Sequence, residues 1–200
     1  MIKNIIFDLG EVLLDFNPRI YLKEKIADKE LAERMYQQIF CCDEWFMLDR
    51  GTIDKDEAIN IISERNPGEG QLIDDILNDW VRILVPIEGT VNILYVLAQK
   101  DYSIYVISNF HWRAYQIVSE KYDFFDLFEG LIISSEVNLM KPEPAIYRAL
   151  LEKYDLIAEE SIFIDDNINN IEAAQSLGIH GVHFASPIEL KKSLEKMELL

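Results

Sequence analysis

The sequence predicts an α/β fold with a mainly parallel sheet, helices on both faces of that sheet, and an inserted helical cap domain. From residue 86 onward, short apolar runs alternate with amphipathic segments of helical spacing, which is the pattern of consecutive β-α-β units. One further apolar run, residues 4–8, lies at the N-terminus. Between these parts the segments are amphipathic and charge-rich. We therefore expect a core domain at 1–17 and 86–200, interrupted by a helical cap domain at 18–85.

The apolar runs are expected to form the buried strands of the sheet, at residues 4–8, 103–107, 131–134, 161–164 and 181–184. The amphipathic segments that alternate with them predict helices at residues 90–99, 113–121, 143–153, 169–177 and 188–196. Gly178 directly follows the fourth of these helices and is a favourable residue for ending it. This alternation predicts a Rossmann-like arrangement, with one parallel sheet between two layers of helices.

The cap is expected to contain helices at residues 20–26, 29–40, 55–63 and 71–81. Trp45, Phe46 and Arg50 fall in a stretch without helical periodicity, and Gly51 supplies a turn after them. These three side chains are expected either to pack inside the cap or to face the active site.

Composition and charge limit the partners of this protein. The formal net charge of −17 repels nucleic acid phosphates, so we expect no nucleic-acid partner. No apolar run approaches the roughly 20 residues that a membrane helix needs, and we find no signal-peptide cleavage site. The only cysteines are the neighbours Cys41 and Cys42, which suit a reducing compartment. These features predict a cytoplasmic protein without a membrane partner. We expect a monomer or a weak homo-oligomer.

Small polar or ionisable residues lie at the ends of three predicted strands and in one loop: Asp8, Ser108 and Asn109, Lys141, and Asp165 and Asp166. Because the carboxyl ends of parallel strands lie along one edge of a sheet, these side chains are expected to converge. Each group alone has a plain structural explanation, such as a helix N-cap or an ordinary turn. Together they predict a functional site.

The chemistry of the converging residues is that of phosphoryl transfer. Asp8 and Asp166 offer the oxygen ligands that Mg²⁺ prefers, and Lys141 offers a positive charge for a phosphate. The Ser108 hydroxyl and the Asn109 amide can donate hydrogen bonds to phosphate oxygens. Asp8 is the expected nucleophile, because an aspartyl phosphate divides one difficult displacement into two easier ones.

The order and spacing of these residues resemble the haloacid dehalogenase superfamily of phosphatases and phosphomutases. The resemblance extends over nearly the whole chain and includes the helical cap. The four motifs that carry it are Asp8–Gly10, Ser108-Asn109, Lys141-Pro142 and Phe163–Ile179.

The resemblance implies a Mg²⁺-dependent phosphatase that acts on a small phosphorylated substrate. Asp8 would be the nucleophile and a metal ligand, together with the Gly10 backbone carbonyl and the Asp166 carboxylate. Asp165 would lie behind these ligands or bind the ion through water. The residues that hold the transferring phosphoryl group would be Ser108, Asn109 and Lys141.

Gly10 departs from the usual phosphatase pattern, which has a second aspartate at this position as general acid and base. Such assistance contributes roughly 10²–10⁴-fold to a rate. Glu11 and Asp15 are the neighbouring carboxylates that remain as candidates for this role. A stabilised leaving group needs less assistance, and the FDLG-x-V form also resembles a subgroup that includes a bacterial glucose 1-phosphate phosphatase. Both points favour a sugar phosphate such as a hexose 1-phosphate.

Other functions fit part of the pattern. A metal-independent 2-haloacid dehalogenase also lacks the second aspartate, but it has no use for the Asp165-Asp166 pair. A phosphomutase depends on the acid–base group that Gly10 does not provide, and only Gly10 favours a binding or regulatory protein without turnover. His111 and Trp112 follow the second motif and are candidates for flanking the pocket. His180 and His183 are expected to be structural.

Overall fold

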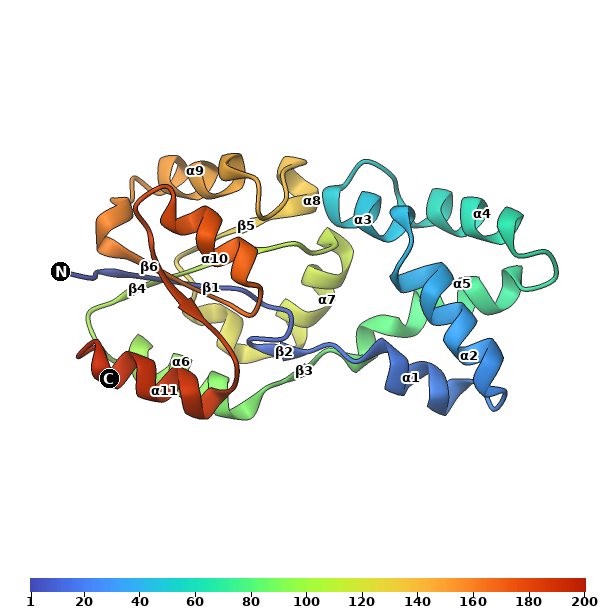
Figure 1. Ribbon diagram of the computed structural model, residues 1–200, viewed down its shortest axis with the longest axis horizontal. Coiled ribbons are helices and arrows are strands. Elements are labelled where there is room, and N and C mark those ends of the chain that lie inside the picture. The colour runs from blue at the N-terminus through green and yellow to red at the C-terminus, as the bar shows by residue number, and fades with distance from the viewer.

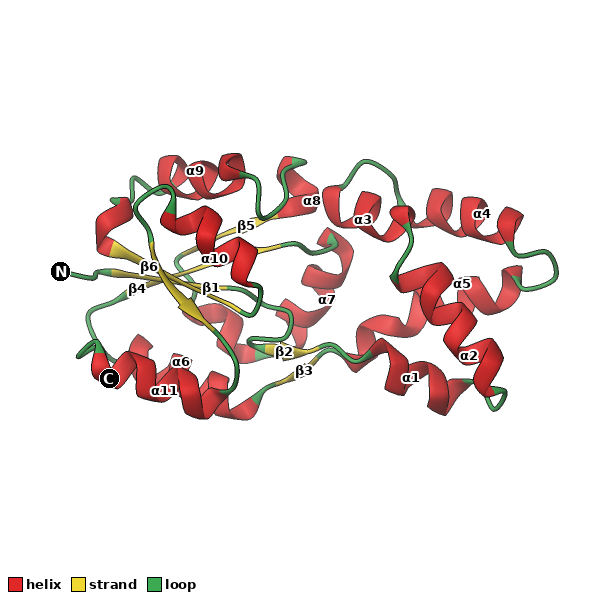
Figure 2. Cartoon of the chain, viewed as in Figure 1, coloured by secondary structure: helices red, strands yellow, loops and turns green.

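The computed structural model describes all 200 residues, Met1–Leu200, and contains a five-stranded parallel sheet (Figures 1 and 2). The strand order is β5-β4-β1-β6-β7. Its strands are β1 (Asn4–Phe7), β4 (Ser103–Ser108), β5 (Gly130–Ile133), β6 (Ser161–Asp165) and β7 (His180–His183). The predicted α/β class is therefore confirmed. Since β1 pairs in parallel with both β4 and β6, the ends of these three strands lie together.

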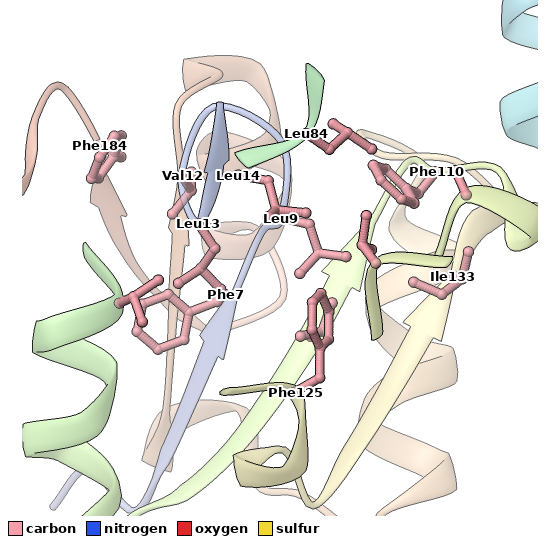
Figure 3. Close-up of a cluster of buried hydrophobic side chains, with 14 of the residues drawn as sticks. Phe7, Leu9, Val12, Leu13, Leu14, Leu84, Phe110, Phe125, Ile133 and Phe184 are labelled. Atoms are coloured by element: carbon pink, nitrogen blue, oxygen red, sulfur yellow. The ribbon is translucent and has the colours of Figure 1, made fainter. Parts of the chain in front are cut away.

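Helices cover both faces of the sheet because successive strand residues alternate between two apolar clusters. Ile5 and Phe7 belong to the larger cluster, together with residues of α6 (Glu88–Ala98), α7 (Trp112–Lys121) and α11 (Pro187–Lys196). Figure 3 shows part of this cluster, with Phe7 and Leu9 among the labelled side chains. Ile6 belongs to the second cluster, together with residues of α9 (Pro144–Lys153) and α10 (Ile168–Gln175). This alternation is the packing expected of a doubly covered sheet.

The helices between β2 (Leu14–Asp15) and β3 (Val85–Pro86) form a lobe at one end of the molecule, which we call the helical lobe (residues 18–83; Figure 1). Its elements are α1 (Pro18–Lys25), α2 (Lys29–Met35), the π-helix Tyr36–Phe40, α3 (Asp43–Arg50), α4 (Lys55–Arg65), α5 (Gly70–Asp79) and the 3₁₀-helix Trp80–Ile83. Buried residues of the lobe, such as Trp45 and Trp80, are continuous with the larger apolar cluster. None of the helices combines the length and the apolar character needed to cross a membrane.

Two short strands join the helical lobe to the sheet. β2 (Leu14–Asp15) and β3 (Val85–Pro86) form an antiparallel ribbon, in which Leu14 pairs with Pro86. The sequence pattern did not predict this ribbon, because two-residue strands are too short to show a period of two. Both passages of the chain between the lobe and the sheet run through it (Figure 2).

Helix α3 corrects the expectation that Trp45, Phe46 and Arg50 lie in a non-periodic stretch. The periodicity is hidden because Phe46, although apolar, is 55% exposed, whereas Trp45 is buried. Acidic residues in the first turn favour the helix, and Gly51 ends it in the left-handed conformation, with φ of +75°. A Cβ atom at Gly51 would lie 2.1 Å from the Ser135 carbonyl oxygen, so glycine is required on steric grounds as well.

Candidate active site

Four of the predicted site residues meet at the carboxyl edge of the sheet. Asp8 follows β1, Ser108 ends β4, and Asp165 ends β6. The Ser108 hydroxyl donates a hydrogen bond of 2.8 Å to Asp8 Oδ1. Lys141 Nζ lies 2.7 Å from both Asp8 Oδ1 and Asp165 Oδ2. The lysine therefore bridges two carboxylates that the strand pairing brings together.

This charged group is almost completely enclosed, since Asp8 is 7% exposed, Lys141 is 5% exposed and Asp165 is fully buried. Burial raises the pKa of Asp8, and the charge of Lys141 only partly opposes that effect. Burial acts to lower the pKa of Lys141, but the charges of Asp8 and Asp165 outweigh it and raise that pKa. Lys141 is consequently a cation in this site, and it carries one positive charge against two carboxylates.

Asn109 contacts the backbone of Lys141 through both ends of its side-chain amide. Its Nδ2 donates to the Lys141 carbonyl oxygen at 3.0 Å, and its Oδ1 accepts from the Lys141 amide at 2.8 Å. The amide therefore connects the end of β4 to the loop that carries the lysine. Its predicted contact with a phosphoryl group stays a prediction, because in this arrangement the side chain is occupied by Lys141.

Asp165 is oriented by residues that the sequence pattern did not single out. The Asn170 side-chain amide donates to both of its carboxylate oxygens, at 2.9 and 3.2 Å, and the Asn167 backbone amide donates to Oδ1 at 2.8 Å. The Tyr147 hydroxyl in turn donates to the Asn170 carbonyl oxygen at 2.9 Å. Asn167 and Asn170 lie within the Phe163–Ile179 motif, but only the place of Asn170 in the first turn of α10, five positions after Asp165, could have indicated the contact.

The site also has the donor set of a metal centre. Carboxylate oxygens of Asp8, Asp165 and Asp166 all lie within 4.8 Å of one another, and Asp166 is exposed. Partial burial and, to a smaller extent, the charge of the neighbouring Asp165 raise the pKa of Asp166. Hard oxygen donors with one open, solvated side fit a divalent cation such as Mg²⁺. Gly10 lies between β1 and β2, and its carbonyl stays a predicted ligand.

The structure also places the other residues that the sequence analysis named. Glu11 has a left-handed backbone, with φ of +57°, and its carboxylate accepts from the Phe16 amide at 2.9 Å. Asp15 is exposed in β2. The ring nitrogens of His180 and His183 contact the backbone carbonyls of Glu159 and Asp166, as structural histidines would.

His111 lies at the junction of the sheet and the helical lobe. Its ring packs between Trp45 and Trp80, with centroid distances of 4.5 and 5.2 Å, and its Nε2 is 3.1 Å from Asp49 Oδ1. It also lines a cavity of about 640 Å³ between the lobe and α7, where Trp112 lies as well. None of the four converging residues lines this cavity.

Comparison with known proteins identifies the class to which this fold and site belong. The model of the haloacid dehalogenase-like hydrolases matches residues 2–178. The chain belongs to this family, and it is a hydrolase.

Individual relatives are similar over most of the chain. A sesquiterpene phosphatase (astK) of Aspergillus oryzae is 26% identical, over 98% of this chain and 96% of its own length. A D-ribitol-5-phosphate phosphatase of Bacteroides thetaiotaomicron is 25% identical over 89% of both chains. A drimenol cyclase (drtB) of Aspergillus calidoustus is 28% identical over 97% of this chain, which spans 36% of that longer protein.

Solved structures show the same architecture. The family enzyme bt-2542 of Bacteroides thetaiotaomicron, in complex with magnesium and inorganic phosphate, is 28% identical with a TM-score of 0.72. The similarity covers 93% of this chain and 96% of that one. The sequence-based assignment to the superfamily is thus confirmed.

Proposed function

We propose that this protein is a Mg²⁺-dependent phosphatase that hydrolyses a small phosphorylated metabolite through an aspartyl-phosphate intermediate. The observation that carries the proposal is the contact of Lys141 with Asp8, beside the Ser108 hydroxyl and the three-carboxylate cluster. Its relatives with phosphatase names and the magnesium and phosphate complex of bt-2542 support it. The alternative function, a metal-free dehalogenase, gives no role to the exposed Asp166 carboxylate.

Each residue has a defined part in the proposed reaction. An Asp8 carboxylate oxygen attacks phosphorus, a new P–O bond forms, and the bond to the leaving alcohol breaks. Water then cleaves the acyl phosphate and restores the carboxylate. Lys141 and Ser108, with Asn109 if its amide is released, hold the phosphoryl oxygens and neutralise their charge.

The proposed metal ligands are the Asp8 carboxylate, the Gly10 carbonyl and Asp166. When bound, Mg²⁺ would supply positive charge to the transferring group. Asp165 lies behind these ligands, and we assign it the task of holding Lys141, since it accepts from Nζ at 2.7 Å. Because Asp165 holds the Lys141 ammonium group, that group stays in contact with Asp8.

The substrate we propose is a sugar phosphate such as a hexose 1-phosphate. The D-ribitol-5-phosphate phosphatase among the relatives supports a polyol phosphate, and the sesquiterpene phosphatase makes an apolar alcohol the main alternative. We propose residues 18–85 as the cap domain, over a core of 1–17 and 86–200. We further propose a cytoplasmic monomer or weak homo-oligomer.

Phosphate release should depend on Mg²⁺ and on Asp166. We expect p-nitrophenyl phosphate and a panel of hexose, polyol and isoprenoid phosphates to give turnover with Mg²⁺ and none after EDTA treatment.

Asp166→Asn should weaken Mg²⁺ binding by about 10-fold or more, measured by titration calorimetry, because it removes an anionic ligand. Chloride release from 2-chloropropionate without Mg²⁺ would instead establish the dehalogenase, and tight ligand binding without any turnover would establish a binding protein.

Gly10→Asp should increase turnover of substrates with a poor leaving group. A Cβ atom at Gly10 meets no other atom within 4 Å, so a side chain can start there without a clash. We expect kcat for an alkyl phosphate to rise by about 10²-fold, the lower range for general acid–base assistance. The rise for p-nitrophenyl phosphate should be smaller, because that leaving group needs no proton. Gly10→Asn is the matched control, because its amide has a similar size but cannot transfer a proton in the same way. Equal kcat values for the two variants would refute the hypothesis that the site lacks a general acid and base.

A further inference from the structure

Apart from the β2–β3 ribbon and the contacts of His111 with Trp45 and Trp80, the helical lobe contacts the sheet-containing part of the molecule at one more place. The end of α3 lies against α8 (Ser134–Val137) and the residue that follows it (Figure 1). The Asn138 side-chain amide donates to the carbonyls of Arg50 and Gly51, at 2.9 and 3.2 Å. The Ser134 hydroxyl donates to the Asp49 carbonyl. These bonds attach the lobe beside the active-site edge of the sheet.

An ion pair extends this contact to the loop that carries Lys141. The Arg50 guanidinium binds the Glu143 carboxylate through two nitrogens. Glu143 closes a four-residue turn, because its backbone amide donates to the Met140 carbonyl at 2.8 Å and its Oε2 accepts from the Met140 amide at 3.4 Å. Lys141 is one of the two central residues of that turn. Arg50 therefore holds the closing residue of the turn that presents the lysine.

The Lys141 turn is thus held by one contact from the sheet-containing part of the molecule and by another from the helical lobe. Asn109 binds the Lys141 backbone from β4, within the same part of the molecule. Arg50 binds Glu143 from the lobe. A phosphoryl group has to touch Asp8 and Lys141, which are nearly inaccessible in this arrangement. The helical lobe lies beyond the strand ends that carry these two residues (Figure 1), so a movement of the lobe that opened this edge would break the Arg50 contact.

We propose that Arg50 is a positioning residue that couples the closed position of the helical lobe to the placement of Lys141. In the closed position the ion pair with Glu143 adds a contact from the lobe to the lysine turn. In an open position that contact is lost, and only contacts within the sheet-containing part, such as those of Asn109 and Asp165, remain. The kinetic consequence of this coupling rests on the proposed phosphatase function. The structural consequence does not.

Hydrogen–deuterium exchange tests the structural consequence without any substrate. In Arg50→Ala we expect faster exchange in a peptide covering residues 138–145, with exchange in β1 unchanged. Arg19→Ala is the matched control, since Arg19 pairs with Glu33 within the lobe at similar exposure and touches neither the turn nor the sheet. Equal exchange at residues 138–145 in Arg50→Ala, Arg19→Ala and the parent would overturn the proposal.

Kinetics test the coupling to turnover. Arg50→Ala should lower kcat about three- to fivefold, the range for a partly exposed ion pair, with a smaller change in KM. Glu143→Gln, which keeps an oxygen for the Met140 amide, should lower kcat similarly, and the double variant should be no worse than either single variant. The difference from the parent should shrink at high ionic strength. Additive losses of kcat in the double variant would contradict the coupling. If the parent protein shows no turnover, the proposed phosphatase function is wrong, and the hydrogen–deuterium exchange result alone decides the coupling.

Discussion

Replacing Asp8 by asparagine is expected to reduce phosphate release by about 10⁴-fold or more, as loss of a nucleophile does in other enzymes with covalent intermediates. An amide of the same shape cannot form the acyl phosphate, although Ser108 and Lys141 remain in place. The measurement is phosphate release from p-nitrophenyl phosphate with saturating Mg²⁺. Trapping of ³²P on the parent protein, and not on the variant, would identify the covalent step directly.

The stability of Asp8→Asn shows whether a loss of activity comes from the missing nucleophile or from unfolding. Asp8 and Asp165 are two buried carboxylates that share one lysine, so the substitution removes an excess negative charge. We expect the free energy of unfolding of the metal-free variant to equal or exceed that of the parent, as is common when a group kept for function rather than stability is removed. A variant that retains activity would disprove the nucleophile, and one that is strongly destabilised would show that Asp8 is primarily structural.

Lys141→Met is expected to have the opposite effect on stability. It leaves Asp8 and Asp165 buried together without a cation, and breaking a buried ion pair from one side costs roughly 3–5 kcal/mol. We expect this decrease in the free energy of unfolding from urea denaturation of the metal-free protein. Mg²⁺ should restore part of the loss, because an ion bound only to the folded state stabilises it.

A matched surface lysine controls for loss of charge in general. Lys3 pairs with Glu160 at 2.8 Å but is largely exposed, so Lys3→Met should change the free energy of unfolding by less than about 1 kcal/mol. If Lys141→Met were as mild as Lys3→Met, the enclosed triad of Asp8, Lys141 and Asp165 would not exist in solution as described.

The sheet and the converging residues could be predicted because both depend on short-range pattern and strand order. Strands covered on both faces, such as β1 and β6, are continuous apolar runs. Parallel strands place Asp8, Ser108 and Asp165 at one edge whatever the details of packing. These features need no knowledge of which side chains touch.

The elements that escaped prediction depend on tertiary contacts. Helix α3 exposes Phe46 and buries Trp45, so its apolar residues do not follow the expected spacing. The pairing of Asn109 with the Lys141 backbone joins residues 32 positions apart, and no local pattern encodes it. The Arg50–Glu143 ion pair spans 93 positions for the same reason.

The β2–β3 ribbon has a consequence for how such a protein can diversify. Leu14 pairs with Pro86 and Asp15 with Val85. The entire helical lobe is therefore inserted between two paired strands, in the way that a loop is inserted in a hairpin. A segment whose two ends are neighbours can be lengthened, shortened or exchanged for another with little change in the path of the flanking chain. We therefore expect the part that carries Asp8 and the helical lobe to behave as separable modules, with these two residue pairs as the junction at which one lobe could be exchanged for another.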